Sequence, residues 1–535
     1  MIDGSKRYTR PQVPLSEIPN LKGKKLEFNS VAEMLAMRAR ETPDAVHVLY
    51  YDEVITYAQV NERANKVANY LKERGVKKGD IVSEMILNSP EIYYTLFGVH
   101  KLGAVASAIN SNLKGPEIAY VLEDSMPKVV FVGSDYMEEF AKGWRLSTYK
   151  PIVVEVVTGV EHQVNIASET LKSILEKYLS NECLVPQNLD DPFLLLYSSG
   201  TTGTPKGILL SNRNQLSTCK DRTGMTSYLP GDVIMIILPM FHVNPLCCHT
   251  YPVSYQGLTL CIRKKFSPSD FWPALIQYGV TAVQGVPAMY SYIYKAADPA
   301  IIDYKKLKLR MAFSGAAPMP QELVNGFREK FNVTMIDGYG LTESCGIATS
   351  SLGMPENRAS IGITYPRLQV EIMDDNNILF YGERGEICIK GEGVMIGYLN
   401  KPEATAEVIR DGWLHTGDMG SMNEFGCVFI SGRKKEMINR GGENIYPREI
   451  EIPLEGHPKI ADVAVIGAPD SSLGERVRAC IILKDSCTMT AEEVKEYLRE
   501  RIAKYKIPEF VDFMNEFPRN STGKILKHEL KKKFE

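Results

Sequence analysis

The chain has 535 residues, of which 44% are hydrophobic and 24% are charged, with a net charge of −3. This length is too great for one hydrophobic core, and the composition is that of a globular protein with several lobes. The small net charge argues against nucleic acid as a partner, and no apolar run reaches the roughly 18 residues of a transmembrane segment.

The N-terminal segment "MIDGSKRYTRPQ" has no apolar signal-peptide core, and the ten cysteines form no C-x-x-C pair. These features predict a cytoplasmic protein with reduced thiols. His242, Cys247, Cys248 and His249 lie close together in sequence. Their spacing matches no metal-binding signature, so we expect no metal ion there.

Helical and strand patterns alternate through most of the chain. Apolar residues have helical spacing at 31–43 and 61–75, and valine-rich segments at 127–133, 151–157 and 280–286 read as buried strands. The apolar run 233–241 also reads as a strand. This alternation predicts an α/β fold, with doubly wound parallel sheets in a large N-terminal domain.

The pattern changes after about residue 360. Segments 368–391 and 426–433 read as short strands joined by turns such as "DDNN" and "YGERG", which predicts a β-rich lobe over about 360–432. The last hundred residues return to strand–helix alternation and predict a separate small α+β domain. The sequence contains no internal repeat.

The first motif is "YSSGTTGTPKG" at 197–207. Small hydroxyls and flexible glycines beside Lys206 suit phosphate binding, because backbone N–H groups, hydroxyls and an ammonium can all meet an oxyanion. The motif is not a P-loop, since the glycine and the Ser or Thr of that pattern are missing and both flanks read as strands. A mobile clasp over phosphates is the prediction.

The second motif is "GYGLTES" at 338–344. Thr342 and Glu343 offer hard oxygen ligands suited to Mg²⁺ beside a nucleotide triphosphate, and Tyr339 offers an aromatic face for a base. Upstream, "SGAAPM" at 314–319 places small residues where a planar ring could approach the backbone.

The third motif is "GWLHTGD" at 412–418 with "SGRKKEMINRGGENIYP" at 431–447. Asp418 and Arg433 could hold the hydroxyls of a ribose, or could equally form a surface ion pair. Gly441 and Gly442 would let backbone approach a thin ligand. The fourth motif is "PRNSTGK", where Lys524 follows a flexible turn.

Together and in this order, the four motifs closely resemble those of the adenylate-forming superfamily, which comprises acyl-CoA synthetases, carrier-protein adenylation domains and beetle luciferases. The resemblance extends from "ITYAQVNERANKVANYL" at 55–71 to Lys524. It implies an enzyme that joins a carboxylic acid to ATP, releases pyrophosphate and transfers the acyl group to a thiol. ATP, Mg²⁺ and coenzyme A are the implied cofactors and substrates. It also implies a domain of residues 1–432, a hinge at 433–436 and a mobile C-terminal domain of residues 437–535.

By motif position, the resemblance assigns catalytic roles to Lys206, Thr342, Glu343 and Lys524, with Glu343 as the Mg²⁺ ligand. The implied nucleotide site consists of Ser198, Ser199, Gly200, Thr201, Thr202, Gly203, Thr204, Lys206, Gly315, Ala316, Ala317, Gly338, Tyr339, Gly340, Thr342, Asp418, Arg433 and Lys524. The implied acid pocket includes His242, Val243, Gly285 and Gly340. Lys435 falls at the hinge, and Gly441 with Gly442 at the coenzyme A site.

His242 stands where amino-acid-activating relatives carry Asp, which argues against an α-amino acid as substrate. Asn439 stands where luciferases carry Lys, which argues against luciferase chemistry. A carrier-protein phosphopantetheine remains an alternative acceptor to coenzyme A, and a catalytically silent nucleotide-binding protein remains a further alternative. The identity of the acid and the oligomeric state stay open, a homodimer among the options.

Overall fold

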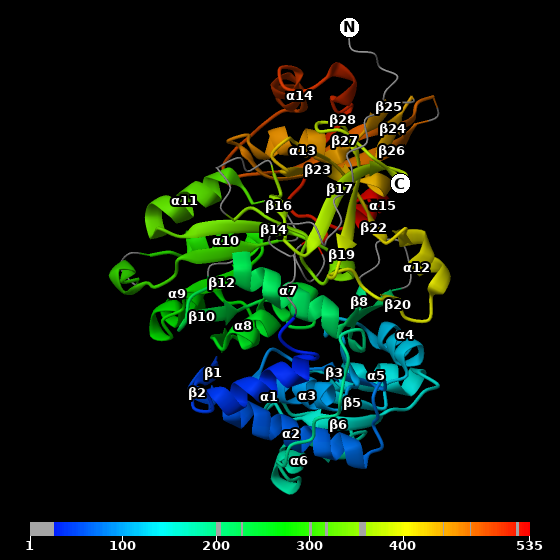
Figure 1. Ribbon diagram of the computed structural model, residues 1–535. Coiled ribbons are helices and arrows are strands. Elements are labelled where there is room, and N and C mark those ends of the chain that lie inside the picture. The colour runs from blue at the N-terminus through cyan, green and yellow to red at the C-terminus, as the bar shows by residue number, and fades with distance from the viewer. Residues whose placement is uncertain are drawn as a thin grey trace.

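The computed structural model describes residues 26–198, 205–225, 228–298, 302–315, 319–352, 360–441, 443–470, 472–519 and 524–534. Four β-sheets organise the molecule (Figure 1). The first sheet follows the order β16 (Ile363–Thr364), β15 (Thr349–Ser350), β14 (Thr334–Tyr339), β13 (Met311–Ser314), β12 (Ala282–Gly285), β10 (Val233–Ile236), β11 (Thr259–Ile262), β1 (Val46–Tyr50) and β2 (Glu53–Thr56). The second follows the order β20 (Gly397–Tyr398), β9 (Lys206–Ser211), β8 (Pro192–Ser198), β4 (Val105–Ala108), β3 (Ile81–Met85), β5 (Val129–Gly133), β6 (Ile152–Val156) and β7 (Glu169–Thr170).

Helices cover both faces of these two sheets. The helices of this part of the chain are α1 (Val31–Glu41), α2 (Tyr57–Glu73), α3 (Pro90–Lys101), α4 (Gly115–Ser125), α5 (Met137–Leu146), α6 (Leu171–Lys177), α7 (Asn212–Met225), α8 (Tyr251–Gln256), α9 (Pro268–Gln277), α10 (Pro287–Lys295) and α11 (Gln321–Phe331). Helices α9 to α11 share one apolar cluster with the first sheet, and α4 and α5 share another with the second. Helices α1 to α3, α7 and α8 lie in the layer between the two sheets.

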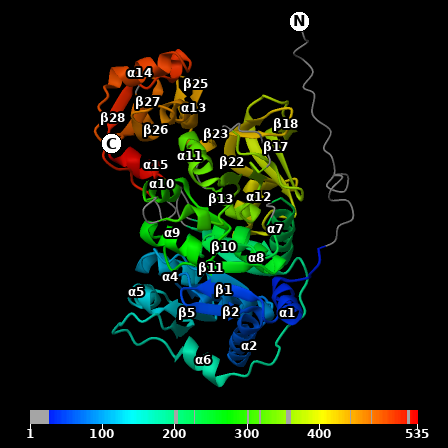
Figure 2. The ribbon, with the colours of Figure 1, turned by 90° about the vertical axis from the view of Figure 1, so that its left-hand side faces the viewer.

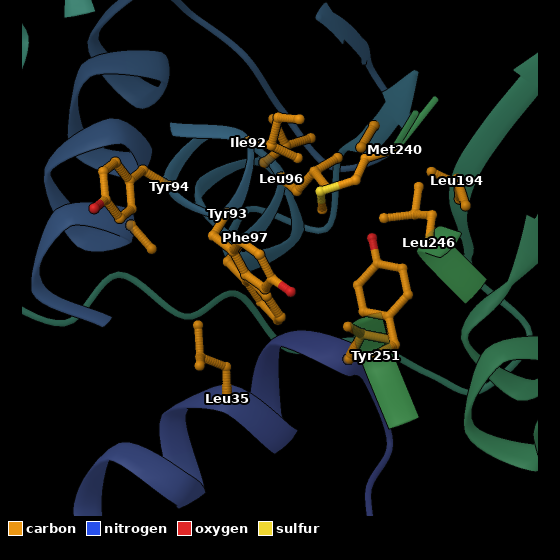
Figure 3. Close-up of a cluster of buried hydrophobic side chains, with 14 of the residues drawn as sticks. Leu35, Ile92, Tyr93, Tyr94, Leu96, Phe97, Leu194, Met240, Leu246 and Tyr251 are labelled. Carbon is orange, nitrogen blue, oxygen red and sulfur yellow. The ribbon is translucent and has the colours of Figure 1, made fainter. Parts of the chain in front are cut away.

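This middle layer contains the largest apolar cluster (Figure 3). Leu35 of α1, Phe97 of α3 and Leu194 of β8 are buried together with Leu246 and Tyr251. Leu246 belongs to a π-helical segment, Asn244–Thr250, that leads directly into α8. The core therefore anchors one side of this π-helical segment, which follows His242 in the chain.

The centres of both sheets are parallel, as the sequence predicts, and antiparallel strands are added at their edges. The predicted strand 233–241 is too long, because β10 ends at Ile236. Pro239 has no N–H to donate. The side chain of Asn88 instead donates to Leu238 O (2.8 Å) and accepts from Met240 N (2.8 Å).

The third sheet is the predicted β-rich lobe and the fourth belongs to the C-terminal part. The third follows the order β18 (Asn377–Ile378), β17 (Leu368–Asp374), β19 (Gly385–Gly391), β22 (Trp413–Met422) and β21 (Ile409–Arg410), with β23 (Val428–Arg433) on β22, and helix α12 (Pro402–Val408) leads into it. The fourth follows the order β25 (Glu443–Ile445), β24 (Ile438–Arg440), β27 (Gly474–Leu483) and β26 (Ile460–Asp470), with β28 (Phe510–Phe513) on β27 and helices α13 (Pro447–Glu455), α14 (Ala491–Arg499) and α15 (Lys527–Lys532).

Figure 2 shows the third and fourth sheets side by side above the first. Between them lies a short 3₁₀ turn, Lys434–Glu436, which coincides with the segment expected to be the hinge. The domain boundaries themselves remain predictions.

Close helix packing between α2 and α3 gives a test of this core. A Cβ atom at Gly98 of α3 would lie 2.6 Å from Cγ1 of Val67 and 3.0 Å from the carbonyl oxygen of Ala64. Overpacking of this kind typically costs about 1–3 kcal/mol. We expect Gly98→Ala to lower the melting temperature measured by circular dichroism by several degrees.

Gly224→Ala is the matched control, because Gly224 also lies in a helix, α7, and no atom of the described residues outside that helix's backbone and its chain neighbours lies within 4 Å of its Cβ position. An alanine there should leave the melting temperature unchanged or raise it, since glycine in a helix costs about 0.5–1 kcal/mol relative to alanine. Equal behaviour of the two variants would contradict the close α2–α3 contact.

Candidate active site

The predicted phosphate clasp joins two antiparallel strands. Ser198 at the end of β8 pairs with Lys206 at the start of β9. The Tyr120 hydroxyl donates to the carbonyl oxygen of Pro205 (3.0 Å), which holds the base of the clasp. The residues between them, Ser199, Gly200, Thr201, Thr202, Gly203 and Thr204, lie outside the described part of the chain. The strand pair thus fixes where the clasp begins and ends.

Tyr398 links this clasp to the second motif. It lies on β20, which pairs with β9. The ammonium of Lys206 is 4.8 Å from the centroid of the Tyr398 ring, and the Tyr398 hydroxyl donates to Glu343 Oε1 (3.0 Å). One side chain therefore positions both the cation expected at the phosphates and the carboxylate expected at Mg²⁺. Tyr398 belongs to none of the sequence motifs, because its contacts come from strand pairing.

The loop that carries Thr342 and Glu343 folds tightly back on itself. A Cβ atom at Gly340 would lie 2.5 Å from the carbonyl oxygen of Gly346, so only glycine fits there. Cys345 has a φ of 55°, in the left-handed region that non-glycine residues seldom adopt. Such conformations recur at functional sites. Thr342 and Glu343 begin a short 3₁₀ turn inside this loop.

Asp418 is held from two sides. Its Oδ1 atom accepts from Arg433 Nε (2.7 Å), and its Oδ2 atom accepts from the Tyr339 hydroxyl (2.7 Å). Asp418 and Arg433 face each other across β22 and β23. Burial, followed by the charge of Asp418, raises the pKa of Tyr339 well above its usual value, so the phenol stays protonated as the donor. The structure thus brings three of the predicted nucleotide-site residues together.

A buried polar group supports the turn before Asp418. Glu386 Oε1 accepts from Gly417 N (2.8 Å), and its Oε2 atom lies 3.3 Å from His415 Nδ1. Cys388 Sγ lies 3.4 Å from the same nitrogen. These three side chains are of metal-ligating types, and their hydrogen bonds to one another and to Gly417 fix the strand at this point.

Lys524 reaches the same place from the C-terminal part of the chain. Burial lowers its pKa, and the nearby cations Arg433 and Lys435 lower it further, while the carboxylates Glu436 and Asp418 oppose them. Partial burial and Arg433 likewise lower the pKa of Lys435, and Lys206 contributes in the same direction. Cations from three segments of the chain therefore lie close together: Arg433, Lys435 and Lys524 lie near Asp418, and Lys206 lies near Lys435.

The residues expected beside the base lie at the ends of β13 and β14. Gly315 follows β13, and a Cβ atom there would lie 3.2 Å from Nδ2 of Asn244 and 3.5 Å from the carbonyl oxygen of Gly338. Because Gly315 has no side chain, a flat ring could approach the backbone here. Ala316 and Ala317 lie outside the described residues.

The structure brings only some of the residues expected at the acid pocket close to one another. A Cβ atom at Gly346 would lie 3.1 Å from Cγ2 of Val243, so the π-helical segment borders the loop with Gly340. The ring of His242 lies 4.3 Å from that of Phe241, and burial lowers the pKa of His242 to about 4. His242 is therefore neutral near pH 7. The atoms nearest to the Cβ position of Gly285 belong to Tyr290 instead.

Of the two glycines expected at coenzyme A, Gly441 is described. Its φ is 61°, and its N–H donates to the carbonyl oxygen of Leu473 (2.7 Å). Gly442 lies outside the described residues. Gly441 directly follows β24 of the fourth sheet.

The fold and the site together combine a strand pair at the two ends of the predicted phosphate clasp with a group of cations near Asp418. A family model described as AMP-binding enzyme matches residues 35–399, and the model of the AMP-binding enzyme C-terminal domain matches residues 449–524. The chain therefore belongs to the AMP-binding enzyme family.

Named relatives are CoA ligases. The chain is 33% identical over 519 residues to the long-chain-fatty-acid–CoA ligase FadD13 of Mycobacterium tuberculosis, covering 95% of this chain and 99% of that protein. It is 33% identical over 500 residues to a feruloyl-CoA synthase of an Amycolatopsis species, covering 93% and 97%. ATP-bound MatB from Rhodopseudomonas palustris has a similar structure, with a TM-score of 0.86, 27% identity and coverage of 95% and 99%.

These similarities confirm the predicted family, the α/β fold class and an enzyme of the acid–thiol ligase type. In the part of the chain that the structure describes, no helix has the length and apolarity needed to cross a membrane.

The neutral, half-buried His242 gives a test of the acid pocket. We expect His242→Ala to change the relative kcat/KM values among carboxylic acids by about tenfold, because the shorter side chain enlarges the expected acid pocket. The KM for ATP should change little. Pyrophosphate release with a panel of acids measures both quantities.

His528→Ala is the control, since His528 is exposed on α15. It should leave every kinetic constant unchanged. If His242→Ala also preserves the ranking of acids and each kcat/KM value, His242 does not border the acid.

Proposed function

We propose that this enzyme joins a carboxylic acid to coenzyme A in two steps, through an acyl-adenylate and with release of pyrophosphate. The observation that carries the proposal is the gathering of Arg433, Lys435 and Lys524 near Asp418, with Lys206 close to Lys435. A cation cluster with one buried carboxylate suits a ligand that carries both phosphates and a sugar.

In the first step, Asp418 and Arg433 hold the ribose of ATP, and Tyr339 with the backbone at Gly315 and Gly338 borders adenine. Lys206, Ser198 and the clasp hold the β- and γ-phosphates. The acid's carboxylate attacks the α-phosphorus, a P–O bond forms, and the bond to the pyrophosphate oxygen breaks. Two anions meet in this step, so positioned cations at the site of developing charge lower its barrier.

Lys524 is the cation best placed for that role. It lies within range of Asp418 and Arg433, which are at the ribose, and therefore near the α-phosphate. Its ammonium would offset the charge of the attacking carboxylate and of the α-phosphate oxygens. The arrangement seen here thus corresponds to the adenylate-forming pose.

Mg²⁺ fits the donors near the clasp. Glu343 and Thr342 present oxygen atoms, which hard divalent cations prefer, and the Tyr398 hydroxyl orients the carboxylate of Glu343. We assign Glu343 as the residue that would hold Mg²⁺, which would neutralise phosphate charge when bound. Thr342 would contact the α-phosphate.

In the second step, the thiolate sulfur of coenzyme A attacks the acyl carbon, a C–S bond forms, and AMP leaves. Gly441 lies on the fourth sheet, where its N–H donates to the carbonyl oxygen of Leu473. A rotation about Lys435 that withdraws Lys524 and brings Gly441 and Gly442 to the site would allow the step. The names of the relatives support coenzyme A as the acceptor over a carrier protein.

Pyrophosphate release with a panel of aliphatic and aromatic acids, each with and without coenzyme A, tests the proposal. Thioester formation with at least one acid supports it. No acid-dependent pyrophosphate release with any acid would leave a nucleotide-binding protein as the better account.

Lys524→Ala separates the two steps. Removal of a positioned charged donor typically costs about 10²–10³ in rate. We expect acid-dependent pyrophosphate release to fall by that factor. With preformed acyl-adenylate and coenzyme A, the variant should form the thioester at close to the wild-type rate, because Lys524 is withdrawn in that pose.

Lys504→Ala, an exposed lysine of the same C-terminal part, is the matched control and should affect neither step. Equal loss of both half-reactions in Lys524→Ala, with normal ATP binding, would mean that Lys524 serves both poses. The rotation described above would then be wrong.

Lys435→Pro tests the hinge. Lys435 lies in a 3₁₀ turn, whose φ values are close to the φ of about −65° that proline imposes. Proline should therefore preserve the present pose and oppose rotation. We expect adenylation to survive and thioester formation to fall by at least tenfold, measured as separate half-reactions.

Lys435→Ala removes the same charge without restricting φ and should retain thioester formation. If the alanine and proline variants lose the second step equally, the charge of Lys435 matters and its position as a pivot does not.

A further inference from the structure

Gln284 is a buried glutamine whose amide has no partner among the residues that the structure describes. The residue lies on β12 with 0% exposure, and neither Oε1 nor Nε2 has a hydrogen-bond partner in this part of the chain. Buried amides are normally hydrogen bonded, because their transfer from water is otherwise unfavourable. A glutamine in this state therefore points to a ligand group.

The sheet register shows what Gln284 faces. It pairs in register with Ile236 of β10 and Phe313 of β13, so these three side chains project from the same face of the first sheet. Ile236 and Phe313 both belong to the apolar cluster between the two large sheets. Gln284 thus faces the layer that contains the π-helical segment after His242.

Polar side chains gather over Phe313 on this face. The guanidinium carbon of Arg222 is 4.6 Å from the centroid of the Phe313 ring, and the rings of His249 and Tyr228 are 5.2 and 5.8 Å from it. The Tyr228 hydroxyl lies 3.2 Å from His249 Nδ1. Arginine keeps its charge in proteins, so the surroundings of Phe313 are electropositive although buried.

The same group borders the acid site. Arg222 Nε donates to the carbonyl oxygen of Cys248 (3.0 Å). A Cβ atom at Gly346 would lie 2.5 Å from Sγ of Cys248 and 3.1 Å from Val243. Val243, the expected wall of the acid pocket, directly precedes the π-helical segment, and Cys248, which Arg222 contacts, lies about one turn further along it. An acid whose carboxylate meets Lys524 would extend its far end in this direction.

We propose, on the basis of the acid–CoA ligase function above, that the substrate is an acid with a second oxygen-bearing group at its far end. A carboxylate or carbonyl oxygen there would accept from Nε2 of Gln284, in electropositive surroundings provided by Arg222. This makes Gln284 a specificity-determining residue for a polar acid and against a plain hydrocarbon acid.

The test compares acids of equal length that differ only at the far end. Suitable sets are hexanoate with 6-oxohexanoate and hexanedioate, and benzoate with 4-formylbenzoate and benzene-1,4-dicarboxylate. We expect the wild-type kcat/KM for pyrophosphate release to favour an oxygen-bearing member of at least one set by tenfold or more. Gln284→Met, which conserves volume, should reduce that preference at least tenfold and leave the KM for ATP unchanged.

Thermal stability distinguishes substrate binding from a structural role. Gln284→Met should keep or raise the melting temperature, because it removes an unpaired buried amide. Gln215→Met is the matched comparison, since Gln215 is also fully buried but donates to Cys247 O (2.9 Å), and its loss should lower the melting temperature.

Each other outcome is decisive. The wild-type enzyme could instead release pyrophosphate faster with the hydrocarbon members, with Gln284→Met ranking the acids in the same order. That result would overturn the inference and leave the ligase function intact. Equal destabilisation by Gln284→Met and Gln215→Met would also overturn it. Release with no acid at all would contradict the ligase function and the inference together.

Discussion

The site depends on holding like charges close together. Arg433, Lys435 and Lys524 lie within range of one another, with Asp418 and Glu436 among them, and Lys206 lies within range of Lys435. Two unit charges roughly 6 Å apart repel by about 3 kcal/mol in surroundings of intermediate polarity. A flexible chain would separate these groups, so the fold must enforce their approach. The same repulsion makes a polyphosphate a favourable ligand, because its charge offsets that of the cations.

Strand pairing is how the fold enforces it. Lys206 is fixed by the β8–β9 pair and Arg433 by the β22–β23 pair, in two different sheets. Tyr398 joins Lys206 to the Glu343 loop, because β20 pairs with β9 although nearly two hundred residues separate the two strands in sequence. The rigid strands thus carry the groups that must not move.

Short motifs made much of this predictable. The alternating pattern gave the parallel sheets, and "GYGLTES" and "GWLHTGD" contain Tyr339 and Asp418, which the structure joins by a hydrogen bond. The sequence could not give Tyr398 or Gln284, because their roles arise from contacts between segments far apart in the chain. It also overextended the strand at 233–241, since the decisive hydrogen bonds come from Asn88, about 150 residues earlier.

The attachment of the C-terminal part shows how two poses could be close in free energy. Its own core is compact and apolar, with Ile450, Leu454 and Val465 fully buried. Its ionic contacts with the rest of the chain include Arg384 with Glu449 and Lys484 with Glu322, where Nζ and Oε2 are 3.6 Å apart.

Exposed pairs such as Glu322 with Lys484, which are 82% and 41% exposed, contribute about 0.2–1 kcal/mol and weaken in salt, so breaking this pair costs little. The buried pair of Lys527 with Glu451 (2.7 Å), by contrast, lies wholly within the C-terminal part. The proposed rotation would therefore preserve the Lys527–Glu451 pair and break the exposed Lys484–Glu322 pair at small cost.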